Sequence, residues 1–144
     1  MVDFTSLLSK PAGEAKKPEA LVAANYPGIV KSFEVGDNNK NKTPYVRFHL
    51  GLTSWPGEPQ LDPDGKPIDL SKRQLRRDFY LTDDALWRLD EVLQEVMGIE
   101  INGRAYSEVL PETTGKQLLV EVQQYMNQQN NEVGNQVGAL LKLE

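Results

Sequence analysis

Aromatic rings and positive charges alternate along two short segments of the sequence. Tyr45, Arg47 and His49 occupy every second position of the first segment, and Arg76 and Tyr80 belong to the second. Residues two apart on a strand point to the same side, so these side chains should share one surface. Such a surface suits single-stranded nucleic acid, because bases stack on aromatic faces while Lys or Arg contacts the phosphates. The pattern also fits an ordinary exposed strand, since Tyr favours β-structure and Arg packs its stem beside it.

Further positive charges and a tryptophan complete the candidate surface. Lys31, Lys42 and Arg73 are assigned as additional phosphate partners. Trp55 is either a further platform for a base or a ring that closes one end of the fold. The candidate DNA-binding residues are therefore Tyr45, Arg47, His49, Arg76, Tyr80, Arg73, Lys31, Lys42 and Trp55.

The charge of the chain is unevenly distributed. Its net charge is −5, yet residues 31–77 carry nine Lys or Arg against six Asp or Glu, a local charge of +3 that leaves −8 for the remainder. A protein that coats nucleic acid over its whole surface needs clustered positive charge throughout. The basic middle of the chain therefore forms either one charged face or a set of solvated loops.

The side chains needed for catalysis are scarce. His49 is the only histidine, alternation places it on an open strand face, and there is no cysteine. Residues 62–65 resemble the start of a calcium loop, but the later ligands are missing, so we expect a turn there. No Gly-rich phosphate cradle lies between a strand and a helix. We expect a protein that is not an enzyme and that needs no metal and no cofactor.

Length and composition indicate one domain that folds without disulfides. The chain has 144 residues, of which 39% are hydrophobic and 26% are charged, an ordinary balance for a globular domain. No apolar run approaches the roughly 20 residues of a membrane span, and residues 1–4 do not begin a signal peptide. We expect a cytoplasmic protein with no membrane contact.

Hydrophobic periodicity predicts strands, one helix and a flexible N-terminal arm. The arm covers residues 1–20, where no period is sustained, and the domain covers residues 21–144. The helix follows Thr82, which is expected to cap it, and ends at Gly98. Arg77 has inward parity in its strand, which indicates either a bulge or a position at the rim. The five expected strands cover residues 26–35, 45–52, 75–81, 117–126 and 133–143.

The order of these elements predicts the fold class. Three strands, a helix and two strands follow each other along the chain, which is the order in an OB-fold, where the helix plugs a five-stranded barrel. We therefore expect a mainly β fold, an OB-type barrel with one α-helix between its third and fourth strands. Other small α+β domains can share this order.

Four stretches of the chain resemble bacteriophage-encoded single-stranded-DNA-binding proteins of the OB-fold type. The resemblance rests on their order and spacing across most of residues 21–143. The four stretches are residues 25–30, 45–50, 79–89 and 115–122. The resemblance implies that this protein coats exposed DNA during phage replication or recombination in the host cytoplasm. The runner-up interpretation is a non-catalytic protein-interaction adaptor of a phage assembly, built on a small β-barrel.

The resemblance also bears on partners. Many such proteins end in an acidic tail that recruits partner enzymes, whereas this chain ends in Leu141-Lys142-Leu143-Glu144 directly after the last expected strand. Either the protein lacks such a tail or the chain is shortened. Single-stranded DNA is the expected partner, with replication or recombination proteins as further candidates. A homo-oligomer and a cooperative array on DNA both remain open.

Overall fold

The computed structural model describes residues 20–38, 40, 42–129 and 131–143. The expected N-terminal arm over residues 1–20 lies outside the described residues, except for Ala20. None of the helices in the described part of the chain is long and apolar enough to cross a membrane.

Five antiparallel strands form a single sheet, which confirms the mainly β fold predicted from the alternation of apolar residues. The strands are joined in the order β3-β2-β1-β4-β5, so that β1 is central and β3 and β5 are the two edges. The bounds are β1 Ala24–Asp37, β2 Pro44–Leu52, β3 Leu75–Tyr80, β4 Gln117–Asn127 and β5 Glu132–Leu141. Each expected strand is present, with its ends shifted by a few residues.

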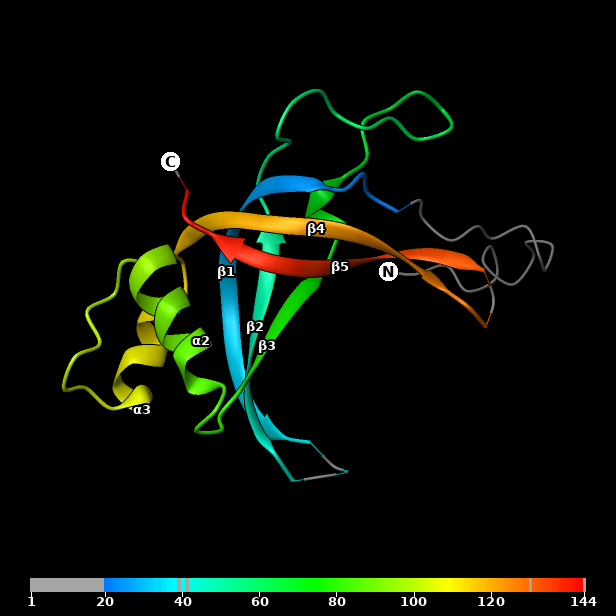
Figure 1. The fold of residues 1–144 in the computed structure, drawn as a ribbon. Coiled ribbons are helices and arrows are strands. Elements are labelled where there is room, and N and C mark those ends of the chain that lie inside the picture. The colour runs from blue at the N-terminus through cyan, green and yellow to red at the C-terminus, as the bar shows by residue number, and fades with distance from the viewer. Residues whose placement is uncertain (1–19, 39, 41, 130, 144) are drawn as a thin grey trace, which may run out of the picture.

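The long strand β1 joins the two halves of the sheet. Its first half pairs with β4, and its second half pairs with β2. A register shift between Val30 and Ser32 marks a bulge, which bends a strand. Gly28 lies at the overlap of the two halves, where a Cβ atom would stand only 2.7 Å from the Gly51 carbonyl oxygen. The missing side chain of Gly28 thus permits the close approach of β1 to β2. In Figure 1, the strands β4 and β5 lie across β1, β2 and β3.

Alternate residues of the strands form the hydrophobic core. Val46, Phe48 and Leu50 of β2 are buried, as their alternation predicts, and the rings of Phe48 and Phe79 meet edge to face with centroids 5.8 Å apart. Leu89 and Leu93 cover the core from the helical segment and are fully buried. Burial of these apolar side chains is the main force that holds the sheet and the helical segment together.

Two short α-helices replace the single helix expected from the sequence. The helix α2 (Leu86–Glu91) continues into a π-helical turn, η2 (Val92–Val96), and α3 (Tyr106–Val109) follows after a loop. Gly98 ends the first helical segment as predicted, with φ +69°, and Gly103 has φ +74°. The first helical segment lies where the single helix was expected, but α3 is a second helix beyond Gly98 and Gly103, so the prediction of one helix was wrong.

The beginning of the first helix also differs from the prediction. The residue before α2 is Ala85, and no side chain caps the helix. Instead, the backbone carbonyl of Thr82 accepts hydrogen bonds from the amides of Ala85 and Leu86, at 3.0 and 2.9 Å. Residues 82–85 therefore form a turn, and the expected side-chain cap at Thr82 was wrong.

The long connection between β2 and β3 is largely irregular, as its many Pro and Gly residues predict. It contains the turn expected at residues 62–65, where the Asp62 carboxylate accepts hydrogen bonds from the Asp64 and Lys66 amides, each at 2.9 Å. The one-turn helix η1 (Leu70–Lys72) leads into β3. The apparent calcium motif is thus a self-contained turn in which the carboxylate binds backbone amides.

The sheet remains open at its two edges. Among the described residues, no strand pairing joins β3 to β5, so the closed barrel expected from the sequence is not formed by backbone hydrogen bonds. β3 pairs with β2 without a register shift. Arg77 therefore lies at an open rim, and the alternative of a bulge at this position was wrong.

Candidate nucleic-acid interface

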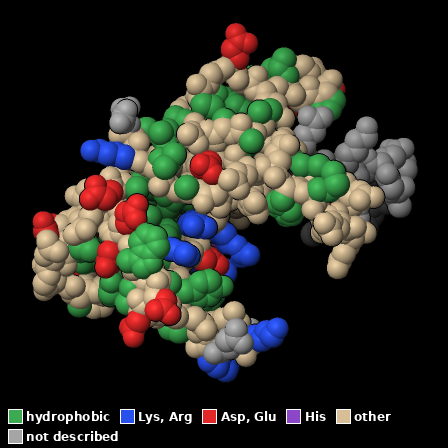
Figure 2. Space-filling view, viewed as in Figure 1, with side chains coloured by type: hydrophobic (Ala, Val, Ile, Leu, Met, Phe, Trp, Pro, Cys, Tyr) green, Lys and Arg blue, Asp and Glu red, His purple; other side chains and the backbone are tan. Residues whose placement is uncertain are grey.

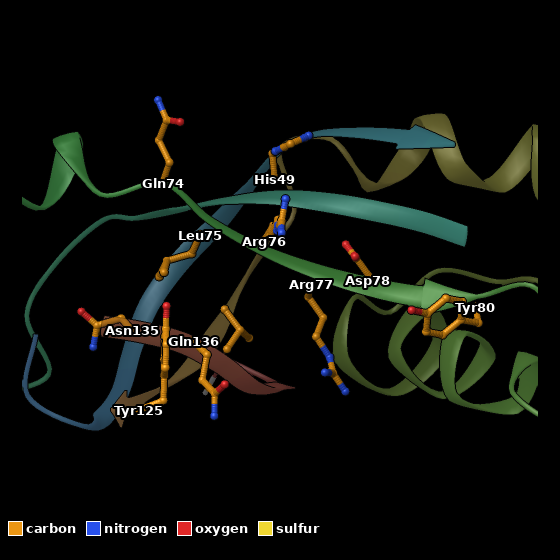
Figure 3. Close-up of a pocket in the computed structure, with 11 residues that line it drawn as sticks. His49, Gln74, Leu75, Arg76, Arg77, Asp78, Tyr80, Tyr125, Asn135 and Gln136 are labelled. Carbon is orange, nitrogen blue, oxygen red and sulfur yellow. The ribbon is translucent and has the colours of Figure 1, made fainter. Parts of the chain in front are cut away.

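The two edges of the sheet enclose a polar groove. It has a volume of about 710 Å³ and is lined by residues that are far apart in the sequence (Figure 3). β3 supplies one wall, and residues of β4 and β5 supply the other. The lining residues are His49, residues 74–78, Tyr80, Tyr125 and residues 135–137.

β3 is an edge strand that forms the rim of this groove, and side chains from both of its faces line the groove. Figure 3 shows Arg76 and Asp78 on one side of the strand and Leu75 and Arg77 on the other. This follows from the alternation of side chains along a strand. An edge strand has no neighbour beyond it, so both sets of side chains reach the same opening.

Arginine side chains in the groove have no acidic partner among the residues that the structure describes. Neither Arg76 nor Arg77 forms an ion pair with any of them. The Arg77 guanidinium carbon lies 5.3 Å from the centroid of the Phe79 ring, and its buried Nε atom has no hydrogen-bond partner. A buried donor without a partner is unfavourable, and no ion pair within the described residues balances the charge of the Arg77 guanidinium.

The groove continues past β3 toward Arg73. A second pocket of about 230 Å³ is lined by Arg73 and shares Gln74, Leu75, Tyr125 and Asn135 with the first. Arg73 likewise has no ion-pair partner in the part of the chain that the structure describes. Figure 2 shows Lys and Arg side chains gathered beside the hollow between the helical part and the β4–β5 hairpin. Arg73, Arg76 and Arg77 thus lie along one continuous path and have no ion-pair partner within the described part of the chain.

Arg47 is placed differently from the arginines of the groove. Its Nε and Nη2 atoms donate to the two carboxylate oxygens of Asp78, at 2.8 and 3.0 Å. Glu34 lies on its other side, with its oxygen 3.7 Å from Nη1. The hydrogen bond to Asp78 raises the pKa of the guanidinium above its ordinary value, so the group stays charged. Its charge is nevertheless balanced by two carboxylates on the same face.

The aromatic and histidine candidates lie on the same outer face of β2 and β3. Tyr45 and Tyr80 are cross-strand partners, and His49 is opposite Arg76. Tyr80 is 45% exposed, whereas Tyr45 is half-buried and lies 5.0 Å from the Arg47 guanidinium. His49 Nε2 is 2.9 Å from a Glu34 carboxylate oxygen. The structure thus brings these side chains together, but only Tyr80, His49 and Arg76 line the groove.

Besides Tyr45 and Arg47, three more of the predicted residues lie away from the groove lining. Lys31 is exposed at the bulge of β1, and its aliphatic stem covers Gly51. Lys42 is exposed beside the β1–β2 turn, with φ +55°. Trp55 packs on Tyr26, with ring centroids 5.7 Å apart, and lines a separate pocket. Trp55 thus packs against the core, and its two alternative roles, as a platform for a base or as a ring that closes one end of the fold, both stay predictions.

Eight groove residues were not among the predicted candidates. They are Gln74, Leu75, Arg77, Asp78, Tyr125, Asn135, Gln136 and Val137. The outward parity of Tyr125 was visible in the sequence, but only the pairing of strands places β4 and β5 opposite β3. Tyr125 is 47% exposed and lines both pockets, so it is the most prominent residue that sequence reasoning missed.

The arrangement can hold an anionic ligand that carries flat rings, since it offers cations, aromatic faces and side-chain amides along one path. In the described residues no group of three or more His, Asp or Glu side chains is placed to hold a metal ion. Compared with known protein families and with curated proteins, the chain matches no family model and no curated sequence.

Proposed function

We propose that this protein binds single-stranded DNA with little sequence preference, along the groove between β3 and β5. The observation that carries the proposal is the convergence of unpaired arginines and exposed tyrosines at one opening. Arg76 and Arg77 come from one edge of the sheet and Tyr125 comes from the opposite half. Unpaired cations attract phosphates, and open aromatic faces attract unpaired bases.

The chemistry favours a single strand over a duplex. In a duplex the faces of the bases are stacked inside the helix, so Tyr80 and Tyr125 could contact only the sugar-phosphate backbone. A single strand can turn its bases toward the rings, and base–aromatic stacking contributes roughly 1–3 kcal/mol per base. Because every base has an aromatic face, such contacts carry little sequence preference.

The strand order supports an OB-type architecture as part of the same proposal. β1 is central, β2 and β4 flank it, and the two remaining strands face each other across the groove. Bringing β3 and β5 together would close the sheet into a five-stranded barrel. OB-folds are partly open barrels that bind oligonucleotides, and the proposed binding groove follows the open seam.

The biological setting rests on the sequence resemblance alone. A phage-encoded protein of this type would coat exposed DNA during replication or recombination, in the cytoplasm of the host. Replication or recombination proteins would then be its protein partners.

Fluorescence anisotropy with a labelled oligo-dT strand tests the proposal. We expect saturable binding that is tighter than to a duplex of equal length and that weakens as salt is raised. Arg76→Ala should weaken binding about fivefold and reduce the dependence on salt, since one phosphate contact is lost. An RNA strand of equal length, measured in parallel, determines the preference for DNA.

Lys66→Ala is the matched control. Lys66 is exposed in the long β2–β3 connection and does not line the groove, so this variant removes one positive charge elsewhere and should bind as the unmodified protein does. Equal losses in the two variants would mean that only net charge matters. Tighter binding to the duplex, or no binding to any strand, would overturn the proposal, and only the absence of binding would favour the adaptor interpretation.

A further inference from the structure

Two hairpins of the sheet carry the same unusual pair, a tyrosine opposite a glycine. Tyr125 of β4 faces Gly134 of β5, and Tyr45 of β2 faces Gly36 of β1. A Cβ atom on Gly134 would stand 2.8 Å from both Cζ and Oη of Tyr125. The Tyr125 ring therefore lies flat over its glycine, in space that any other residue would fill.

The two rings differ in what lies on their other side. The Arg47 guanidinium carbon lies 5.0 Å from the centroid of the Tyr45 ring, and Arg47 is itself held by Asp78. Tyr125 is 47% exposed, and within the described residues no ring or cation stacks on it. Only the Tyr125 ring thus combines a supported face with an open one.

The position of Tyr125 along the groove adds a second observation. It lines both pockets, the one that contains Arg76 and Arg77 and the one that contains Arg73. A strand whose phosphates reach arginines in both pockets must therefore pass this ring. Because the ring is already held over Gly134, little side-chain freedom would be lost when a base stacks on it.

We infer that Tyr125, supported by Gly134, is a nucleobase-stacking subsite of the groove. The inference rests on the proposed function, which it deepens by assigning base contacts to β4 and phosphate contacts to β3. Gly134 acts as a positioning residue, since it touches the ligand only through the ring that it supports.

The substitution Gly134→Ala tests the inference without removing any ring or charge. The added methyl group must displace the Tyr125 ring, and we expect oligo-dT binding to weaken about tenfold, within the range of one lost stacking contact. The slope of affinity against salt should stay unchanged, because the phosphate contacts remain. Gly36→Ala is the matched control: its methyl group would stand 2.9 Å from the Tyr45 hydroxyl, and binding should change less than twofold.

Two further variants keep the test decisive if Gly134→Ala fails to fold, which circular dichroism would reveal. Tyr125→Leu should weaken binding about tenfold, as expected for loss of one stacked base, while Tyr125→Phe should retain it. Photocrosslinking with oligonucleotides that contain 5-iododeoxyuridine should label Tyr125 in the unmodified protein.

The outcomes separate the inference from the proposed function. If the unmodified protein binds oligo-dT and Arg76→Ala weakens that binding, but folded Gly134→Ala and Tyr125→Leu bind normally, the stacking subsite is refuted and the groove stands. If the unmodified protein does not bind single strands, both fail together.

Discussion

The outer face of the first three strands and the groove along β3 contain the same kinds of side chain in opposite electrostatic states. On the outer face Arg47 is bound by Asp78 at 2.8 Å, and His49 contacts Glu34 at 2.9 Å. In the groove, Arg76 and Arg77 have no acidic partner among the described residues. The two regions meet at β3, whose Arg76 and Asp78 lie on the outer face and also line the groove.

The comparison teaches that whether an arginine is free to bind a ligand depends on the residue opposite it in the neighbouring strand. The residue type alone does not decide it. Arg47 and Arg76 are both arginines on the same outer face of adjacent strands, and their positions in the sequence pattern are equivalent. Pairing places Asp78 opposite the first and His49 opposite the second. The first is therefore held as part of the folded structure, and the second remains open to a ligand.

Reversing charge in the groove should give the largest effect. We expect the double variant Arg73→Glu with Arg76→Glu to weaken oligo-dT binding about a hundredfold at low salt, because two attractive contacts become repulsive. The free energy of unfolding should change little, since neither arginine has an ion pair to lose among the described residues. Anisotropy titrations and urea unfolding measure the two quantities.

A control for this variant reverses two charges outside the groove. Lys40 and Lys66 are exposed and do not line it, so Lys40→Glu with Lys66→Glu changes the net charge equally. An equally large loss of binding in this control would show that the groove has no special role and would remove the distinction between the two regions.

The variant Arg47→Ala should show the opposite pattern. It breaks the two hydrogen bonds to Asp78 and uncovers Tyr45, and the pair is only partly shielded, with side chains 20% and 29% exposed. We expect the free energy of unfolding to fall by about 1 kcal/mol, as for a well-aligned ion pair that is partly exposed to solvent. Affinity for oligo-dT should fall by no more than about threefold, because Arg47 does not line the groove but its loss leaves the Asp78 carboxylate beside the groove uncompensated.

Urea unfolding and anisotropy titration of Arg47→Ala provide the check. A tenfold loss of affinity with unchanged stability would mean that Arg47 contacts phosphate directly. Such a result would support the assignment of Arg47 from the sequence pattern and would make the outer face part of the binding surface.

Much of the fold followed from the sequence because apolar alternation is a local signal. Phe48 and its neighbours two residues away identified β2, and Gly98 marked the end of a helical segment. The second helix, α3, was not found in the same way. The segment that leads into it depends on left-handed backbone at Gly103 and on the contacts of Arg104 with Glu100, Glu108 and Glu112.

The candidate site was only partly predictable because its walls come from different parts of the chain. Arg76 and Tyr80 were found from the alternation of one segment, and they line the groove. Tyr125 and Asn135 could be placed only once β4 and β5 were known to face β3. The Asp78 partner of Arg47 was likewise invisible, since register across strands is set by tertiary pairing and not by spacing along one segment.

Neutralising Asp78 should give the smallest effect and is the finest test of the comparison. Asp78→Asn keeps the shape of the side chain and one acceptor for Arg47 but removes the balancing charge beside the groove, which Asp78 also lines. We expect oligo-dT to bind about threefold more tightly, because Arg47 then contributes uncompensated positive charge. Glu58→Gln, in the exposed long connection, removes one negative charge away from the groove and should leave affinity unchanged in the same anisotropy titration. Weaker binding by Asp78→Asn would mean that the ion pair itself shapes the groove, so that the paired outer face and the open groove act as one unit.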